Sequence, residues 1–506
     1  RRILLLACVC GSALSGPAAV THLGELQGQM VRTLAPAETG GTLWGVKVCS
    51  LRTGRTWFET NAAARMVPAS NTKLFTAAMA LERLGAERRL VTSLRVTNAP
   101  DAAGQLNGPL RIVGGGDPTL CDRLHGGSWE RTWAPLIEAV RRAGIRRVEG
   151  DLLCDEGRFT GPPYGSGWNW DDLAEGYGAA VSALTAGDNL VSVVVTPGLT
   201  VGAAAAVRLD PLPDVLSLEV ATRTVAKGSG TDLSLFRLPG DSRLRVAGTI
   251  PLGAPAVTLE ASVPSPALWF GMLFRDALLK AGIPVTGSLR VLGSRDPTSP
   301  GLARAPWKEI AAVPSPTVGE LVREMMKPSQ NLYAQLLWLT VGVESGSGVQ
   351  KGLAGVPLET TEEAGARALD GVLSAAGIAS TEVRLEEGSG LSRKNLITPQ
   401  ATVRLLNYMA RHRYADAWKA SLPVGGVDGT LRQRFTQPGL KGNVRAKTGS
   451  LRNVAALSGY LTNSVGEPLA FSIIANNAVP VGGGPSAREQ TDALVEQLAR
   501  SAVREE

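Results

Sequence analysis

Apolar and polar residues recur with different periods in successive parts of the chain. Residues 43–60 alternate around a Thr53-Gly54 turn, which predicts a hairpin of two strands. The next segment places apolar residues at helical spacing from Leu74 to Leu81 and ends at Gly85, which is a good helix stop. This pattern predicts a helix with Ser70 in its first turn.

The residue pattern changes between residues 95 and 299, where short runs of Val, Leu and Thr are separated by Gly, Pro and Asp. We interpret this stretch as a β-rich insertion of two domains. Helical spacing returns in residues 316–342 with a break at Pro328. After Val444 the pattern predicts strands joined by a turn at 463–467, and then a closing amphipathic helix. Residues 21–94 and 300–506 are therefore expected to form one discontinuous catalytic domain.

The first 20 residues are typical of a secretory signal peptide. Two arginines precede a short apolar stretch and small residues near a plausible cleavage point. The apolar stretch is far too short to span a bilayer, so we expect a periplasmic protein. The sequence Leu5-Leu6-Ala7-Cys8 also fits a lipoprotein site, which leaves lipid anchoring at Cys8 and peripheral membrane association open.

The overall composition is that of a soluble globular protein, with 44% hydrophobic and 19% charged residues. The formal charge is +7, but no basic run carries interleaved aromatics. Nucleic acid is therefore not an expected partner. The three cysteines beyond the leader are an odd number for an oxidising compartment. A disulfide between Cys121 and Cys154 stays open, and Cys49 would then be the free thiol.

Metal and histidine chemistry find little support in the sequence. The histidines, His22, His125 and His412, are isolated from one another, and no Cys-x-x-Cys or His-Glu-x-x-His motif occurs. No metal or cofactor is expected. The sequence gives equally little support for a catalytic triad that contains histidine.

The segment Pro68-Ala-Ser-Asn-Thr-Lys-Leu offers a candidate nucleophile. A serine at a helix start is often only a cap. Lys73, however, follows Ser70 at i+3 and so lies on the same helix face, where its amine can reach the hydroxyl. Serine becomes a nucleophile only with a base, and a lysine with a lowered pKa can be that base.

Two further triplets follow in chain order: Ser329-Gln330-Asn331 and Lys447-Thr448-Gly449. Each is unremarkable in isolation, as a loop and as a strand end. With Ser70-x-x-Lys73 they make the three-part pattern of penicillin-interacting serine enzymes. Lys447 and Thr448 are expected to hold a substrate carboxylate, and Gly449 to let the strand approach the substrate closely.

In this interpretation Ser329 relays a proton to the leaving amine. Asn331 holds the substrate amide and orients Lys73. A lysine must lose about two pKa units to act near neutral pH, and burial together with the charge of Lys447 acts in that direction.

On these residues the sequence resembles the D-alanyl-D-alanine carboxypeptidase/endopeptidase family, the class C low-molecular-mass penicillin-binding proteins. The stretches GGGDPTL, GWNWDDLAEGYGA, EGSGLSRKNLITP and SLPVGGVDGTLRQRF are also similar to that family. Two positions depart from its pattern, since Gln330 and Glu387 stand where the family usually has Asp.

The resemblance implies an α/β fold: a transpeptidase domain like that of penicillin-binding proteins and serine β-lactamases, an antiparallel sheet flanked by helices with a large β-rich insertion. It implies that Ser70 forms an acyl-enzyme with peptidoglycan stem peptides and is acylated by β-lactam antibiotics. The backbone N–H groups of Ser70 and Ser450 are the implied oxyanion donors. Asp172, Tyr177 and Arg393 are implied to bind the side chain of the diamino acid.

Two alternatives remain open on the sequence. A β-lactamase or an esterase could use the same serine, although no dedicated second base for fast deacylation is visible. A non-catalytic module that senses peptidoglycan or antibiotic could keep the fold, although it would have no need of an activated nucleophile.

Overall fold

The computed structural model describes residues 19–38, 40–211, 215–293, 305–346, 359–480 and 482–505. The signal peptide expected at residues 1–20 lies almost wholly outside this part of the chain. Cys8, the candidate for a lipid anchor, also lies outside it.

A five-stranded antiparallel sheet joins the two ends of the chain. Its order is β18-β19-β20-β1-β2. The strands are β1 (Leu43–Ser50), β2 (Thr56–Thr60), β18 (Arg445–Leu451), β19 (Val454–Thr462) and β20 (Pro468–Asn476). Strand β1 pairs with β20 along its full length. The predicted N-terminal hairpin and the turn at 463–467 are both confirmed.

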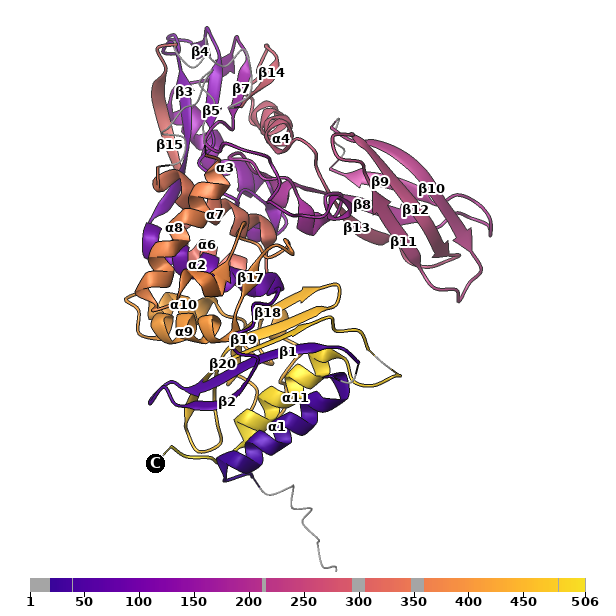
Figure 1. Ribbon diagram of the computed structural model, residues 1–506. Coiled ribbons are helices and arrows are strands. Elements are labelled where there is room, and N and C mark those ends of the chain that lie inside the picture. The colour runs from indigo at the N-terminus through magenta and orange to yellow at the C-terminus, as the bar shows by residue number, and fades with distance from the viewer. Residues whose placement is uncertain are drawn as a thin grey trace, which may run out of the picture.

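Two helices from opposite ends of the chain cover one face of this sheet (Figure 1). They are α1 (Leu23–Glu38) and α11 (Ala487–Arg500). Met30 of α1 and Leu494 of α11 are fully buried in one core with Trp44 and Phe471 of the sheet. Ser486 and Glu489 form a capping box that starts α11 and confirms the predicted closing helix.

A layer of six helices covers the opposite face of the sheet (Figure 1). These are α2 (Thr72–Leu84), α6 (Val318–Met326), α7 (Asn331–Glu344), α8 (Thr361–Ala375), α9 (Pro399–Ala410) and α10 (Ala415–Ser421). The predicted break at Pro328 is confirmed, since it lies between α6 and α7. Helix α7 is apolar almost all round and lies in the middle of this layer, with Tyr333 and Trp338 fully buried.

Between α2 and α6 the chain leaves the helical layer and forms a second sheet. Its order is β14-β7-β5-β3-β15. The strands are β3 (Arg89–Val96), β5 (Leu110–Val113), β7 (Leu152–Asp155), β14 (Leu289–Leu292) and β15 (Lys308–Thr317), with a small ladder of β4 (Gln105–Leu106) and β6 (Arg147–Val148). Helices α3 (Trp129–Arg142) and α4 (Pro266–Lys280) share its core, so this part of the insertion also contains helices that the strand pattern did not predict.

Six further strands form two three-stranded sheets that enclose a separate core. One sheet contains β8 (Leu190–Thr196), β9 (Ala206–Asp210) and β13 (Val257–Ser262), and the other β10 (Ser217–Val225), β11 (Asp232–Phe236) and β12 (Arg243–Pro251). This pair projects to one side in Figure 1. The domain boundaries at residues 95 and 299 stay a prediction; β3 already begins at Arg89 and β15 ends only at Thr317.

Cys49, Cys121 and Cys154 are buried free thiols. The disulfide between Cys121 and Cys154 that the sequence left open is not formed, because the two thiols face different neighbours. A side chain at Gly271 of α4 would meet the Cys154 sulfur, whereas Cys121 lies among the charges of Asp188 and Arg123. Burial raises the pKa of Cys121 to about 12.

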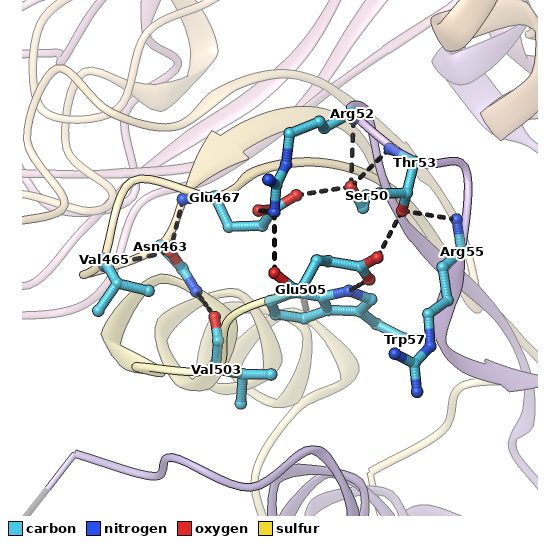
Figure 2. A network of polar contacts seen from close by, with 10 residues as sticks. All are labelled: Ser50, Arg52, Thr53, Arg55, Trp57, Asn463, Val465, Glu467, Val503 and Glu505. Carbon is cyan, nitrogen blue, oxygen red and sulfur yellow. Dashed lines mark hydrogen bonds and ion pairs between the residues drawn. The ribbon is translucent and has the colours of Figure 1, made fainter.

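A polar network ties the two hairpin turns of the main sheet to the segment after α11 (Figure 2). Glu467 is only 5% exposed and accepts hydrogen bonds from Ser50 Oγ at 2.6 Å and Arg52 Nη2 at 2.7 Å. Glu505 accepts from Trp57 Nε1 at 2.5 Å. The buried carboxylate of Glu467 therefore joins elements that are more than 400 positions apart in the sequence.

We expect Glu467→Ala to lower the free energy of unfolding by about 1–3 kcal/mol, because it leaves the buried Ser50 hydroxyl without its acceptor and removes one of the two acceptors of the Arg52 guanidinium. Urea unfolding followed by circular dichroism measures the change. Glu496→Ala is the control, because Glu496 makes only a surface contact of 3.9 Å with Arg500 and such pairs contribute little. Equal losses in both variants would contradict the role of Glu467.

Candidate active site

Ser70 lies in a 3₁₀ turn, Ala69–Asn71, directly before α2, and not in the first turn of the helix as the sequence pattern predicted. Ala69 has φ +48°, a left-handed conformation that costs energy for a residue other than glycine. The N-cap of α2 is Asn71, whose side chain makes no capping bond and instead donates to the Lys447 carbonyl oxygen at 3.1 Å. Ser70 is thus not the N-cap of α2, and its half-buried hydroxyl is available for other chemistry.

Lys73 is fully buried one turn further along α2. Its Nζ lies 2.9 Å from Ser70 Oγ, 2.6 Å from Asn331 Oδ1 and 2.6 Å from the Ser389 carbonyl oxygen. Burial lowers the pKa of Lys73 from 10.5 to about 7, although the negative charge of Glu387 opposes this shift. A substantial fraction of this amine is therefore neutral at physiological pH and able to accept a proton.

Lys447 of β18 is the second fully buried lysine of the site. Its Nζ donates to Ser329 Oγ and to the Thr448 carbonyl oxygen, both at 2.8 Å. Burial first, and the charge of Lys73 second, hold the pKa of Lys447 well below its usual range. Ser329 adopts φ +66° between α6 and α7, which is the strained conformation that presents its hydroxyl to this amine.

Asn331 opens α7 and bridges two parts of the chain. Its Oδ1 accepts from Lys73, and its Nδ2 donates to the Tyr177 carbonyl oxygen at 2.8 Å. Gln330, which replaces the Asp usual in the family, is the N-cap of α7 and accepts from the Leu332 N–H at 3.3 Å. The residue at which this sequence departs from the family pattern is therefore a helix-capping residue.

Thr448, Gly449 and Ser450 follow Lys447 on the edge strand β18. A Cβ on Gly449 would lie 2.6 Å from the Pro68 carbonyl oxygen. Glycine is therefore required for the close packing of β18 against the Ser70 turn, a reason different from the substrate contact that the sequence suggested. Thr448 Oγ1 donates to Thr430 Oγ1 at 2.8 Å, and Ser450 is exposed.

The three residues expected to bind the diamino acid lie in two groups. Tyr177 is 49% exposed and its hydroxyl donates to Asp172 Oδ1 at 2.9 Å. The carbonyl oxygen of Tyr177 is the one that Asn331 contacts, so this pair borders the Lys73 site. Arg393 is exposed and donates to the Arg452 carbonyl oxygen at 2.6 Å, in the turn after β18.

Sequence reasoning noted Glu387 only as a departure from the family pattern, and missed its position. Its buried carboxylate accepts hydrogen bonds from the backbone N–H groups of Ser389 and Gly390, both at 2.7 Å. It also accepts from Asn395 Nδ2 at 2.8 Å and Trp168 Nε1 at 3.1 Å. These bonds fix the loop that presents the Ser389 carbonyl oxygen to Lys73.

The sequence Glu387-Gly388-Ser389-Gly390, in which an acidic residue is followed by two glycines, could have indicated this loop. Gly390 has φ +85°, and a Cβ there would lie 2.0 Å from the Ala69 carbonyl oxygen. No side chain other than hydrogen fits between the loop and the Ser70 turn.

No group of three or more His, Cys, Asp or Glu side chains that could hold a metal ion occurs among the residues that the structure describes. The groups gathered around Ser70 are amines, hydroxyls, an amide and backbone carbonyls. This arrangement defines a serine hydrolase site of the penicillin-binding type.

Comparison with known proteins agrees with that class. Residues 26–501 match the D-Ala-D-Ala carboxypeptidase 3 (S13) family. The chain is 34% identical over 497 residues to a D-alanyl-D-alanine carboxypeptidase of Actinomadura sp. strain R39, a match that covers 95% of this chain and 86% of that protein. It is 27% identical over 417 residues to the D-alanyl-D-alanine carboxypeptidase DacB of Haemophilus influenzae, covering 81% and 80% of the two chains.

Among solved structures, penicillin binding protein 4 of Haemophilus influenzae superposes with a TM-score of 0.75 at 25% identity, covering 92% of this chain and 97% of that one. The protein therefore belongs to the D-Ala-D-Ala carboxypeptidase 3 (S13) family. The family, the fold class and the serine-type carboxypeptidase class that the sequence indicated are confirmed.

We expect Glu387→Gln to slow acylation by a chromogenic β-lactam about 10- to 100-fold, because an amide group turned toward the Ser389 or Gly390 N–H displaces the loop that holds Lys73. Removal of the charge that raises the pKa of Lys73 should also move the midpoint of the acylation pH profile to lower pH.

Glu386→Gln is the matched control, because this neighbouring carboxylate is 26% exposed and its partners are Ser166, Arg384 and Lys394. Stopped-flow rates for both variants across pH 5 to 10 make the comparison. An unchanged midpoint in Glu387→Gln, or an equal fall in rate in both variants, would contradict this role.

Proposed function

We propose that this protein hydrolyses the terminal D-Ala-D-Ala bond of peptidoglycan stem peptides through an acyl-enzyme on Ser70. The observation that carries the proposal is the 2.9 Å contact between Ser70 Oγ and the fully buried amine of Lys73, whose pKa burial lowers to about 7. A neutral amine at hydrogen-bond distance is the general base that a serine nucleophile needs.

In acylation, Lys73 takes the proton of Ser70 as Oγ attacks the carbonyl carbon between the two D-alanines. The backbone N–H groups of Ser70 and Ser450 stabilise the oxyanion, each such donor being worth about 3 kcal/mol. The carbon–nitrogen bond then breaks, and the leaving amine receives a proton from the side of Ser329 and Lys73. Ser329 suits this step because its hydroxyl already accepts a hydrogen bond from Lys447.

In deacylation, water attacks the Ser70 ester and releases the shortened peptide. If the leaving amine belongs to a cross-linked stem instead of free D-alanine, the same steps constitute endopeptidase activity. β-Lactams acylate the same serine, and their leaving group stays tethered in the site, so we expect slow hydrolysis of that ester.

The surroundings of Lys73 favour the peptidase over a β-lactamase. The amine contacts a hydroxyl, an amide and a backbone carbonyl, and no carboxylate among the described residues lies within hydrogen-bond distance of it. Glu387 is already occupied by several donors of its own loop. A dedicated base for rapid deacylation is therefore lacking in this part of the chain.

Asp172 and Tyr177 support recognition of a longer stem peptide, because Tyr177 contacts Asn331 through its carbonyl oxygen and Asp172 through its hydroxyl, and both side chains are accessible. We assign the amine of the diamino acid side chain to Asp172 and its carboxylate to Arg393.

Because the proposed substrate is peptidoglycan, the proposed function also supports export to the periplasm by the N-terminal signal peptide. No helix among the described residues has the length and apolarity to cross a bilayer; lipid anchoring at Cys8 and peripheral membrane association stay proposals.

We expect the wild-type protein to release D-alanine from a muramyl pentapeptide and Ser70→Ala to release none, because the variant lacks the attacking oxygen. Mass spectrometry after incubation with penicillin should locate the adduct on the peptide that carries Ser70. Binding of penicillin without D-alanine release by the wild type would favour the sensor, and rapid penicillin turnover would favour the β-lactamase.

The rate of acylation should depend on pH with an apparent pKa near 7. Protonated Lys73 cannot accept the proton of Ser70, so the rate should fall about tenfold per pH unit below that value and level off above it. Stopped-flow acylation by a chromogenic cephalosporin between pH 5 and 9 provides the measurement. A flat profile would exclude Lys73 as the base.

A further inference from the structure

A second cationic group lies close to the Lys-Thr-Gly triplet. Beside β18 and the start of α11 there is a cavity of about 200 Å³. The hydroxyl-bearing residues Thr430, Thr448 and Ser450 line it together with Arg488. Hydroxyls around an arginine form an environment suited to an anion, and this cavity adjoins the strand on which the substrate is expected to bind.

Lys447 is poorly placed to provide the positive charge for such an anion. It is fully buried, and its Nζ is directed to Ser329 Oγ and the Thr448 carbonyl oxygen. The expectation that Lys447 and Thr448 together hold the substrate carboxylate therefore leaves that carboxylate without an accessible cation from the triplet.

Two arginines line the cavity, and of the two only Arg434 has an ion-pair partner among the described residues. Arg434 is 9% exposed, forms an ion pair with Asp492 and stacks on the ring of Phe435. Arg488 is exposed, and its guanidinium makes neither a hydrogen bond nor an ion pair with another described residue. It is the second residue of α11. The adjacent Glu489 carboxylate is held by the backbone and side chain of Ser486, and Arg488 acts on it only through its charge.

We propose that Arg488 binds the carboxylate at the C-terminus of the substrate and thereby selects peptides with a free carboxylate after the scissile bond. This inference rests on the proposed function. A guanidinium can donate two parallel hydrogen bonds to the two oxygens of a carboxylate. The hydroxyls of Thr448 and Ser450 lie on the same cavity and complete the set of donors.

The test compares two stem pentapeptides that differ only at the end, one with a free D-alanine carboxylate and one with the C-terminal amide. The wild-type protein should prefer the carboxylate. In Arg488→Ala, kcat/KM for the carboxylate peptide should fall about 10- to 100-fold, as expected for a hydrogen-bonded charge pair. The value for the amide peptide should change less than about twofold, since an amide forms no such pair. Arg488→Lys should keep part of the preference.

Arg500→Ala is the matched control, because it removes an exposed arginine from the last turn of the same helix and should leave both values unchanged. An equal fall for the two peptides in Arg488→Ala, or no fall, would overturn the role of Arg488 while D-alanine release by the wild type still supports the proposed function. A wild-type protein that cleaves neither peptide would overturn both.

Discussion

The burial of two lysine amines, one hydrogen-bonded to Ser70 and the other to Ser329, is the constraint on which the site depends. Lys73 and Lys447 are both fully buried, and their hydrogen-bond acceptors are hydroxyls, an amide and backbone carbonyls instead of carboxylates. A charged amine without a counter-ion is costly in such surroundings. The fold therefore favours the neutral form of lysine, which is also the form that can remove a proton from Ser70.

The site needs the sheet and the helical layer to be in contact, because its groups come from α2, from the start of α7, from the 387–390 loop and from β18. Two glycines, Gly390 and Gly449, allow that contact, since a Cβ on either would collide with the backbone just before Ser70. Ala69 and Ser329 both have left-handed backbone conformations. Backbone strain of this kind persists only where surrounding packing enforces it, and here it orients two hydroxyls toward two amines.

The insertion also contributes to the catalytic region. Tyr177 accepts from Asn331 through its carbonyl oxygen, and Trp168 donates to Glu387. Segment 166–177 thus contacts Glu387, in the loop that holds Lys73, and also Asn331, which is hydrogen-bonded to Lys73. The family match, which runs from residue 26 to residue 501, includes this segment together with all five strands of the main sheet.

The sequence by itself determined the local elements and the family. Period and turn residues were sufficient for the first hairpin, for α2 and for α11, because these elements are set by neighbours within a few positions. The order of three short motifs identified the family, since together they are rarely met by chance. Helices α3 and α4 were missed because strand-like runs with turn residues dominate the segment in which they lie.

Only the tertiary structure decided how the amines are held. Lys73 meets the Ser389 carbonyl oxygen across 316 positions, and Lys447 meets Ser329 across 118. Burial depends on these contacts between distant residues and not on the local spacing of residue types. The sequence therefore could not show that Lys447 is directed away from solvent or that Glu387 supports the site. Arg488 was missed for the same reason, because its place beside β18 depends on α11 packing across the sheet.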